Sequence, residues 1–507
     1  MTARRLALVA LCLALLCGTA GAASKDVIYA SESPAKSLDP HDTTDTYSGA
    51  IEKAICQGLM GFDKDLNVIP LLAESYSFNP NATEFTFKLR KGIKFHDGTP
   101  FNADAVRVNI ARLMSGKLKR SSLMKPVKEL VVLDENTVKF VLNEPFGAFV
   151  NAVAHPGALM LSPASIAKYG DDVSKNPVGT GPFIFAEWTG DTVKIKKNPD
   201  YWRGPVKVDT ITFRPVPENG SRLAMLRAGQ AQYIFPLPAE LLKLAQSDPK
   251  VDIIERPSIV ERYLVFNTKY APLADARVRQ AINYALDKQA LIRIAWGGAA
   301  GEADSIIPPN LQFYKKQGTW PHDVAKAKAL MKEAGYENGF KVVFLTPNPS
   351  ARLRATEMVQ QQLKEIGITG DIQSMDVASF YNKLESHRAD DANQLPFIAF
   401  GGWSSSTGDA DWGIRPLLAT AMFPPAGSNF GFFSDKKVDE LIQAGLSSAD
   451  PAVRREAYAK CQDALWPMAP WGYLFVDTLL AGKSKNLKGI YPLPDGAFSV
   501  DEAELAD

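Results

Sequence analysis

The stretch FIAFGGWSSSTGDADW, residues 397–412, joins a short apolar strand directly to a loop rich in polar and aromatic side chains. Residues 397–400 have the composition of a buried strand, and residues 401–412 contain two tryptophans, three serines, one threonine and two aspartates. Hydroxyls, carboxylates and amphipathic rings on a loop held by a rigid strand suit a small polar ligand. The stretch therefore indicates a ligand-binding loop. The alternative is a solvated turn whose tryptophans only pack, and composition does not decide between the two.

Strand and helix patterns alternate along the rest of the chain. Alternating apolar or β-branched residues predict strands, and apolar residues three or four positions apart predict helices. The predicted strands are residues 26–31, 84–89, 137–142, 183–187, 192–196, 262–268 and 471–476. The predicted helices are residues 47–59, 103–113, 275–286, 323–334 and 352–366. This order predicts an α/β chain of several lobes, without fixing which strands share a sheet.

Two local signals add detail to this pattern. Asn102 and Asp323 directly precede helical segments, so we predict them as N-caps, whose side-chain oxygens accept hydrogen bonds from the first turn. The junction VGTGPF, residues 178–183, lacks the third glycine of a phosphate-binding loop, and Pro182 has no N–H to donate. We interpret this junction as a structural turn.

The N-terminus has the pattern of a secretory signal peptide. Arg4 and Arg5 form a positive start, residues 6–16 are apolar, and small residues lead up to Ala22. The apolar run is shorter than the roughly 20 residues that span a membrane. We therefore expect export and cleavage near Ala22. Lipidation at Cys17 is the less favoured alternative, because a leucine and not a small residue precedes it.

Charge and cysteine content narrow the classes of partner. The chain has 57 lysines and arginines against 56 aspartates and glutamates, and removing the two signal arginines leaves a net charge of −1. Nucleic-acid binding needs a basic face, so this balance argues against it. Cys56 and Cys461 remain after cleavage, and their pairing is open because export permits a disulfide but a chain of this size does not need one.

Catalytic and metal-binding patterns are absent from the sequence. The five histidines have no metal-ligand spacing, and no G-x-S-x-G elbow, C-x-x-C pair or P-loop occurs. We therefore expect no catalytic residue, no metal and no cofactor. A secreted hydrolase remains the alternative from a different functional class, since paired carboxylates cannot be recognised without geometry.

Seven motifs in a fixed order resemble the family 5 solute-binding proteins of ABC importers, which include oligopeptide, dipeptide, nickel and glutathione binders. The motifs are SLDP (37–40), FTFKLR (85–90), IKFHDGTP (93–100), NPVGTGP (176–182), NPDYW (198–202), VRQAINYA (278–285) and KEAGY (332–336). Within the family, further segments are similar to the glutathione-binding members. These are AHP (154–156), PSIVERY (257–263), QQQL (360–363) and residues 402–412.

The resemblance implies a two-lobed periplasmic binding protein fold, with a third lobe inserted near the N-terminus. Two crossing strands, expected near residues 263–267 and 473–476, would join the lobes, which close on a ligand between them. The implied division is signal peptide 1–22, lobe I 23–65, 176–265 and 474–507, inserted lobe 66–175, and lobe II 266–473.

The loop at residues 402–412 departs from the pattern of the peptide binders in this family. Those proteins carry an aspartate that pairs with the ligand's α-amine, and here that position is Ser406. A neutral hydroxyl cannot make a charge-assisted bond to an ammonium group. Asp409 and Asp411 are the candidate substitutes, and glutathione suits the change because its amine belongs to a γ-linked glutamyl group. The alternative is that both aspartates only cap a turn or helix.

Glutathione carries two carboxylates, so arginines are expected in its site. The resemblance places Arg354 where dipeptide binders hold the ligand carboxylate, and Arg120 and Arg262 are further candidates. A solvated surface charge is the alternative for each. The full set of predicted ligand contacts is Arg120, Arg262, Arg354, Trp403, Ser406, Thr407, Asp409, Asp411 and Trp412.

The function implied by the resemblance is that of a monomeric periplasmic solute-binding protein. It would bind a small peptide-like molecule, with glutathione favoured, and deliver it to separate permease and ATPase subunits of an ABC importer. Di- or oligopeptides and haem are the alternative ligands within the family.

Overall fold

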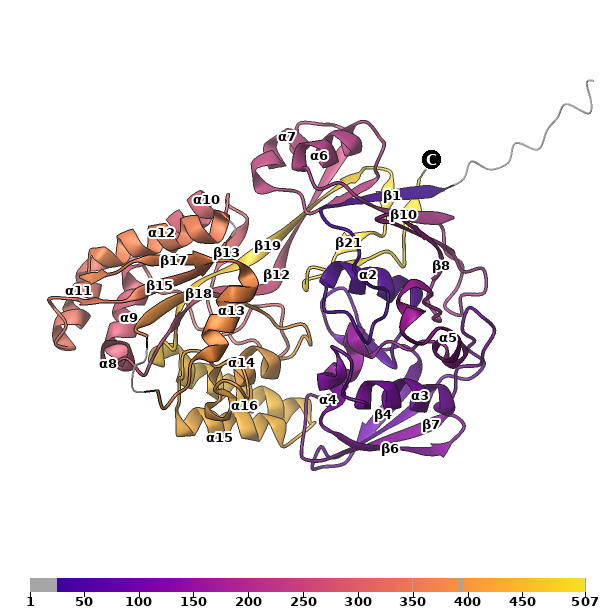
Figure 1. Ribbon diagram of the computed structural model, residues 1–507, viewed down its shortest axis with the longest axis horizontal. Helices are drawn as coiled ribbons and strands as arrows, with labels where there is room; N and C mark the ends of the chain where they lie inside the picture. Colours follow the sequence, from indigo (N-terminus) through magenta and orange to yellow (C-terminus); the bar gives the residue numbers. More distant parts are fainter. Residues whose placement is uncertain (1–24, 349, 392–394, 507) are drawn as a thin grey trace, which may run out of the picture.

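Two long antiparallel strands run through the molecule in the computed structural model, which describes residues 25–348, 350–391 and 395–506 (Figure 1). They are β12 (Val251–Phe266) and β19 (Trp471–Ser484). In one lobe β12 pairs with β18 (Phe397–Ser404), and in the other β19 pairs with β11 (Tyr233–Phe235). The predicted two-lobed α/β fold is confirmed. The predicted signal peptide lies outside the described residues.

Lobe I holds one end of the large sheet, in the order β11-β1-β10-β9-β8. Besides β11, the strands in this order are β1 (Asp26–Ser31), β8 (Phe183–Thr189), β9 (Thr192–Lys197) and β10 (Thr210–Pro215). Inward-facing rings of Tyr29, Phe213, Tyr233 and Phe498 pack edge to face or tilted at centroid distances of 4.5–5.6 Å. Helix α2 (Thr46–Ile55) packs on this core.

The inserted lobe has a sheet and a core of its own. Its strand order is β4-β5-β7-β6, with helices α3 (Ala103–Met114) and α4 (Phe149–Ala154) packed against it. The strands are β4 (Ala73–Phe78), β5 (Glu84–Leu89), β6 (Val127–Asp134) and β7 (Thr137–Leu142). The alternation in residues 84–89 buries Phe85, Phe87 and Leu89 on one face, because successive side chains of a strand point to opposite sides. Asn102 caps α3, as predicted.

Lobe II encloses the other end of the sheet between two helical layers. Its order is β17-β15-β18-β12, with β15 (Val343–Pro347) and β17 (Ile372–Met375). One face is covered by α9 (Ala276–Ala285), α10 (Lys288–Ala295), α11 (Val324–Glu333) and α12 (Ser350–Lys364). The other is covered by α13 (Val377–Ser386), α14 (Ala410–Leu418), α15 (Lys436–Leu446) and α16 (Pro451–Met468). Asp323 caps α11, as predicted.

The inserted lobe also touches lobe II directly. The Gly147 amide donates to the Leu446 carbonyl at 2.8 Å, and Asn151 Nδ2 donates to the Thr407 carbonyl at 2.9 Å. Leu66, from the loop after β2 (Met60–Phe62), packs into the lobe II core. Lobe II therefore meets the rest of the molecule in two places: at the paired strands β12 and β19, and at this contact with the inserted lobe.

Several predicted elements differ in length from the observed ones. Helix α2 ends at Ile55, four residues before the predicted end, because the chain must turn there against residues 178–183. A Cβ on Gly179 would lie 2.1 Å from the Ile55 carbonyl oxygen, and the Gly181 amide donates to that oxygen at 2.8 Å. The junction is therefore a close-packed structural turn, as interpreted from the sequence. Among the described residues, no helix is long and apolar enough to span a bilayer.

Candidate functional site

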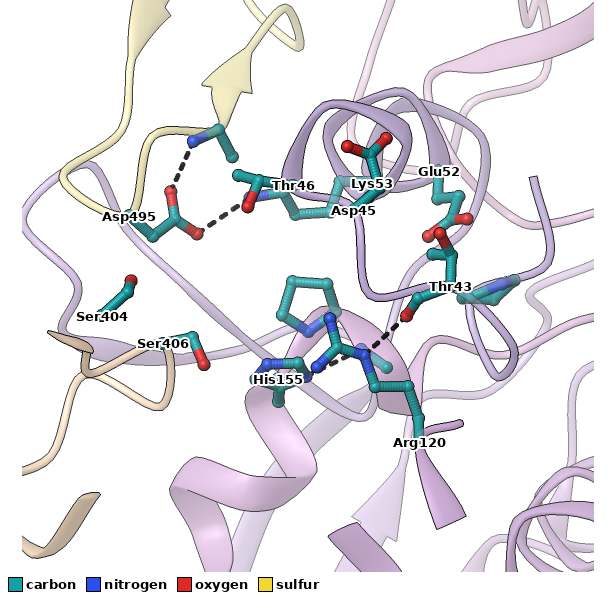
Figure 2. A pocket seen from close by; sticks show the side chains of 15 residues that line it. Thr43, Asp45, Thr46, Glu52, Lys53, Arg120, His155, Ser404, Ser406 and Asp495 are labelled. Atoms are coloured by element: carbon teal, nitrogen blue, oxygen red, sulfur yellow. Dashed lines mark hydrogen bonds and ion pairs between the residues drawn. The ribbon is translucent and has the colours of Figure 1, made fainter. Parts of the chain in front are cut away.

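A pocket of about 450 Å³, its open mouth included, lies where the lobes face each other. Helix α2 and the loop before it form one wall, and Ser404 and Ser406 from the end of β18 form the opposite wall (Figure 2). The lining residues are Pro40, Thr43, Asp45, Thr46, Gly49, Glu52, Lys53, Arg120, His155, Pro156, Gly157, Ser404, Ser406, Asp495 and Ala497. Lobe I, the inserted lobe and lobe II all contribute to this pocket.

Helix α2 positions the acidic wall. Asp45 is its N-cap and accepts hydrogen bonds from the Ser48 amide at 2.9 Å and from the Ser48 hydroxyl. Residues three, four and seven positions apart lie on one side of a helix, so Gly49, Glu52 and Lys53 continue the face that Asp45 begins. A stable N-cap thus fixes the place of two charged side chains, Glu52 and Lys53, about two turns further on.

Glu52 is buried at this wall, with 1% of its surface exposed. Neither carboxylate oxygen has a hydrogen-bond partner among the described residues. Burial raises the pKa of Glu52 well above its usual range, and the negative charge of Asp39 adds to this effect. In the neighbouring residue Lys53, the Nζ atom lies 3.7 Å from Oδ2 of Asp495.

Arg120 brings a cation from the inserted lobe. Its Nε donates to the Thr43 carbonyl at 2.7 Å, and its backbone amide donates to the His41 carbonyl at 3.1 Å. These bonds leave both Nη groups without a partner among the described residues. Beside it, His155 is buried and accepts from the Gly157 amide through Nδ1 at 2.9 Å. Burial, with the charge of Arg120 second, lowers the pKa of His155 to about 3, so the imidazole is neutral at pH 7.

The predicted binding loop reaches the pocket through its serines. The Ser406 amide donates to the Ser404 carbonyl at 2.9 Å, which forms a tight turn at the end of β18. Ser404 and Ser406 face the pocket, and the structure gives neither hydroxyl a partner within the described ranges. Of the predicted contacts, Arg120 and Ser406 are therefore brought together at one site.

The two aspartates of the loop are engaged inside lobe II. Asp409 is fully buried, caps α14 and receives two hydrogen bonds from Arg454 at 2.7 and 2.8 Å. Asp411 receives bonds of 2.8–3.1 Å from Arg415. These contacts favour the alternative given by the sequence, in which the aspartates hold the loop and its helix in place.

The aromatic residues and the threonine of the loop also make internal contacts. Trp403 Nε1 donates to the Trp412 carbonyl at 2.8 Å, and the two rings lie 6.0 Å apart. Both side chains are half-buried. Thr407 is buried, and its carbonyl accepts the bond from Asn151 that joins lobe II to the inserted lobe.

The other predicted arginines lie away from the lining of the pocket. Arg262, on β12, pairs with Asp477 at 2.6 Å and lies 5.6 Å from the ring of Trp296. Arg354 is exposed on α12. Arg352, two residues earlier, is half-buried, and burial together with the charge of Arg262 lowers its pKa. The structure thus brings Arg352, and not Arg354, close to the charged pair on β12 and β19.

Sequence reasoning missed Glu52, Lys53 and Asp495. One usable signal was present, since Glu52 interrupts the apolar face of the predicted helix at residues 47–59. The contribution of Asp495 could not be read locally, because it comes from the opposite end of the chain.

The two remaining cysteines lie in different cores. Cys56 is buried in lobe I and Cys461 is buried in lobe II, and both are free thiols. The pairing left open by the sequence therefore does not occur in this structure. Across the described residues, no three His, Cys, Asp or Glu side chains gather closely enough to hold a metal ion.

Residues 67–423 match the bacterial extracellular solute-binding proteins, family 5 (middle). The glutathione-binding protein GsiB of Pectobacterium atrosepticum is 40% identical over 490 residues, covering 96% of this chain and 95% of the relative. The structure of HbpA2 from Haemophilus parasuis is similar with a TM-score of 0.86 at 25% identity, covering 95% of this chain and 100% of that one. A dipeptide-binding protein from Pseudoalteromonas sp. SM9913 in complex with Met-Leu has a TM-score of 0.76 at 25% identity, with the same coverage of both chains.

Proposed function

Because the chain belongs to the bacterial extracellular solute-binding proteins of family 5, we propose that it binds glutathione in the pocket between its lobes and delivers it to an ABC importer. The observation that carries this proposal is a pocket with charges of both signs, formed jointly by both lobes and the inserted lobe. The family consists of binding components of transport systems, and so no catalytic step is part of the proposal.

The chemistry of glutathione matches the groups that line the pocket. Glutathione has two carboxylates, one ammonium group and two amides, and it is flexible. Arg120 and Lys53 offer positive charge for carboxylates, and Ser404 and Ser406 offer hydroxyls for amide groups. Glu52 offers negative charge for the ammonium group. A ligand that carries a single charge would leave part of this lining unpaired.

The ligand contacts that we infer from the structure differ from those that the sequence predicts. We infer that Arg120 and Ser406 touch the ligand, whereas Asp409, Asp411, Trp403, Thr407 and Trp412 hold the loop that presents Ser406. The support is that both aspartates are bonded to arginines inside lobe II.

A dipeptide is the second candidate ligand, because the Pseudoalteromonas relative holds Met-Leu. A dipeptide has one carboxylate and one ammonium group, and would use fewer of the charged groups. Haem, the remaining alternative, lacks an ammonium group and would need a larger apolar lining than these residues provide.

Export, partners and assembly complete the proposal. The protein acts in the periplasm after cleavage near Ala22, works as a monomer, and docks on a separate permease whose ATPase subunits drive import. Each lobe contacts the permease through its outer face. Stimulation of permease ATPase activity by the loaded protein tests this part, and an ATPase that ignores the loaded protein contradicts it.

Calorimetry on the mature protein, residues 23–507, tests ligand identity. We expect saturable binding of one glutathione per chain, and recovery of the ligand unchanged. At 100 times its Kd the ligand should stabilise the fold by about 2.7 kcal/mol. Arg120→Ala should weaken binding at least tenfold, about 1.4 kcal/mol, whereas Arg354→Ala, an exposed arginine, should change it less than about twofold. Tighter binding of Met-Leu than of glutathione would select the second candidate, and chemical turnover would refute the proposal.

A further inference from the structure

Glu52 is a buried acid that faces the pocket and has no partner in the protein. Its surface is 1% exposed, and both carboxylate oxygens lack a hydrogen bond among the described residues. An ionised carboxylate without a partner is unfavourable at a buried position, because it has lost its hydration and makes no hydrogen bond or ion pair that compensates for the loss. Such a group is either protonated or paired by a molecule that is added to the protein.

The charged neighbours of Glu52 make their hydrogen bonds and ion pairs among the described residues with other groups and not with Glu52. Arg112 binds Asp39 through two hydrogen bonds of 2.6 and 2.9 Å, and Asp45 accepts from Ser48. Lys53 lies next to Asp495, and Arg120 Nε donates to the Thr43 carbonyl. Within the described residues Glu52 forms no ion pair with either cation of the pocket. Glu52 is therefore the acid of the lining that makes no hydrogen bond or ion pair at all among the described residues, whereas Asp45 and Asp495 each make at least one.

We propose that the Glu52 carboxylate accepts hydrogen bonds from the ammonium group of the ligand and thereby selects ligands with a free amine. The inference rests on the proposed function and names the residue that recognises the amine. The opposite wall supports it, because Ser404 and Ser406 present only neutral hydroxyls there. The loop's aspartates cannot take this role while they bind Arg454 and Arg415.

Binding at Glu52 moves a proton. Without a ligand, burial raises the pKa of this carboxyl well above its usual range, which favours the protonated form. An arriving ammonium group stabilises the ionised form, and the carboxyl proton passes to solvent as the charge-assisted pair forms. The other titratable groups near Glu52 are Asp39, Asp45, Lys53, Cys56 and Arg120, and His155 lines the same pocket. Of these His155 is neutral at pH 7 because its pKa is about 3, so it does not exchange the proton.

The decisive experiment compares Glu52→Gln with the parent protein, using glutathione and N-acetylglutathione, whose amine is blocked. The parent should prefer glutathione at least tenfold. Glu52→Gln keeps the shape but not the charge, so it should lose about thirtyfold in glutathione affinity and bind both compounds alike. Glu129→Gln, an exposed residue of β6, is the matched control and should bind as the parent does.

Calorimetry in buffers with different ionisation enthalpies measures the proton. The parent should release up to one proton for each glutathione bound near pH 7, and Glu52→Gln should release none. This readout separates ligand contact from a general loss of structure. The same measurement can be made on the parent alone, so it does not depend on whether Glu52→Gln folds. If the parent binds glutathione without releasing a proton and without preferring the free amine, the inference is wrong.

These experiments distinguish a failure of the proposed function from a failure of the proposed role of Glu52. If the parent binds Met-Leu and not glutathione, but Glu52→Gln weakens Met-Leu and removes proton release, glutathione is wrong and the role of Glu52 stands. If Glu52→Gln binds glutathione within about threefold of the parent, the role of Glu52 is wrong and the proposed function stands.

Discussion

At the scale of single residues, the loop at 401–412 shows what a sequence can and cannot reveal. Its polar composition indicated a ligand-binding loop, and the structure places Ser406 of this loop in the lining of the pocket. The roles of Asp409 and Asp411 could not be derived, because the deciding partner of Asp409 is Arg454, 45 positions further along. The local sequence around a loop carboxylate does not indicate whether the carboxylate binds a ligand or pairs with an arginine that is distant in the chain.

The Asp409–Arg454 pair predicts a large effect on stability. Asp409→Asn would leave a buried guanidinium without its counter-ion, which typically costs about 3–5 kcal/mol. Urea unfolding of the variant should show this loss, while the folded fraction keeps its affinity for glutathione. Asp104→Asn is the control, since Asp104 and its partner Arg107 are 64% and 55% exposed and the pair should contribute less than about 1 kcal/mol. Unchanged stability with lost affinity would instead identify Asp409 as a ligand contact.

At the scale of secondary structure, the helices were easier to predict than the two long strands. Asn102 and Asp323 are side-chain N-caps where the sequence indicated them, because capping depends on neighbours three residues away. Only the ends of β12 and β19 were predicted. The first half of β12, VDIIERP, has no strict alternation, and its pairing is irregular between Pro257 and Glu261. A strand that changes environment between lobes has no single buried face to produce a pattern.

Helix α2 links helix capping to ligand binding. Asp45→Ala should remove the N-cap, cost about 1 kcal/mol of stability and weaken glutathione binding, because α2 carries Glu52 and Lys53. Asp323→Ala removes the equivalent cap of α11 in lobe II and should cost a similar amount without affecting affinity. Urea unfolding and calorimetry on both variants provide the comparison.

An Asp45→Asn variant distinguishes the cap from a direct ligand contact. Asparagine is as good an N-cap as aspartate, but it lacks the negative charge. Stability and affinity close to those of the parent would assign the effect to the cap. Equal losses of affinity in the Asp45 and Asp323 alanine variants would contradict the link to α2.

At the scale of the whole molecule, the pocket exists only through the arrangement of the lobes. Its lining comes from residues 40–53, the inserted lobe, the end of β18 and the C-terminal segment. No stretch of sequence contains this site, and the local signals for Glu52 and Asp495 are weak. The family resemblance predicted the lobes and the place between them, but not which charges would face the ligand.

The contact between Gly147 and lobe II tests whether closure of the lobes supports binding. A Cβ at Gly147 would lie 1.9 Å from the Ser448 carbonyl oxygen, and because this neighbour is backbone, no side-chain rotation relieves the clash. Gly147→Ala should therefore hold the lobes apart. We expect glutathione affinity to fall at least tenfold, about 1.4 kcal/mol, with little change in the unfolding midpoint of the ligand-free protein.

Calorimetry measures this loss of affinity, and small-angle scattering with saturating glutathione should give a larger radius of gyration for Gly147→Ala than for the parent. Gly301→Ala is the matched control, because a Cβ there meets nothing within 4 Å. Residue 301 lies in β13 (Ala300–Glu302), which pairs with β19. Both alanines add one methyl group, but only that at residue 147 obstructs the contact between the lobes. If Gly147→Ala binds glutathione as tightly as Gly301→Ala does, then the contact at Leu446 and Ser448 is not needed for binding, and the ligand is held from within the pocket alone.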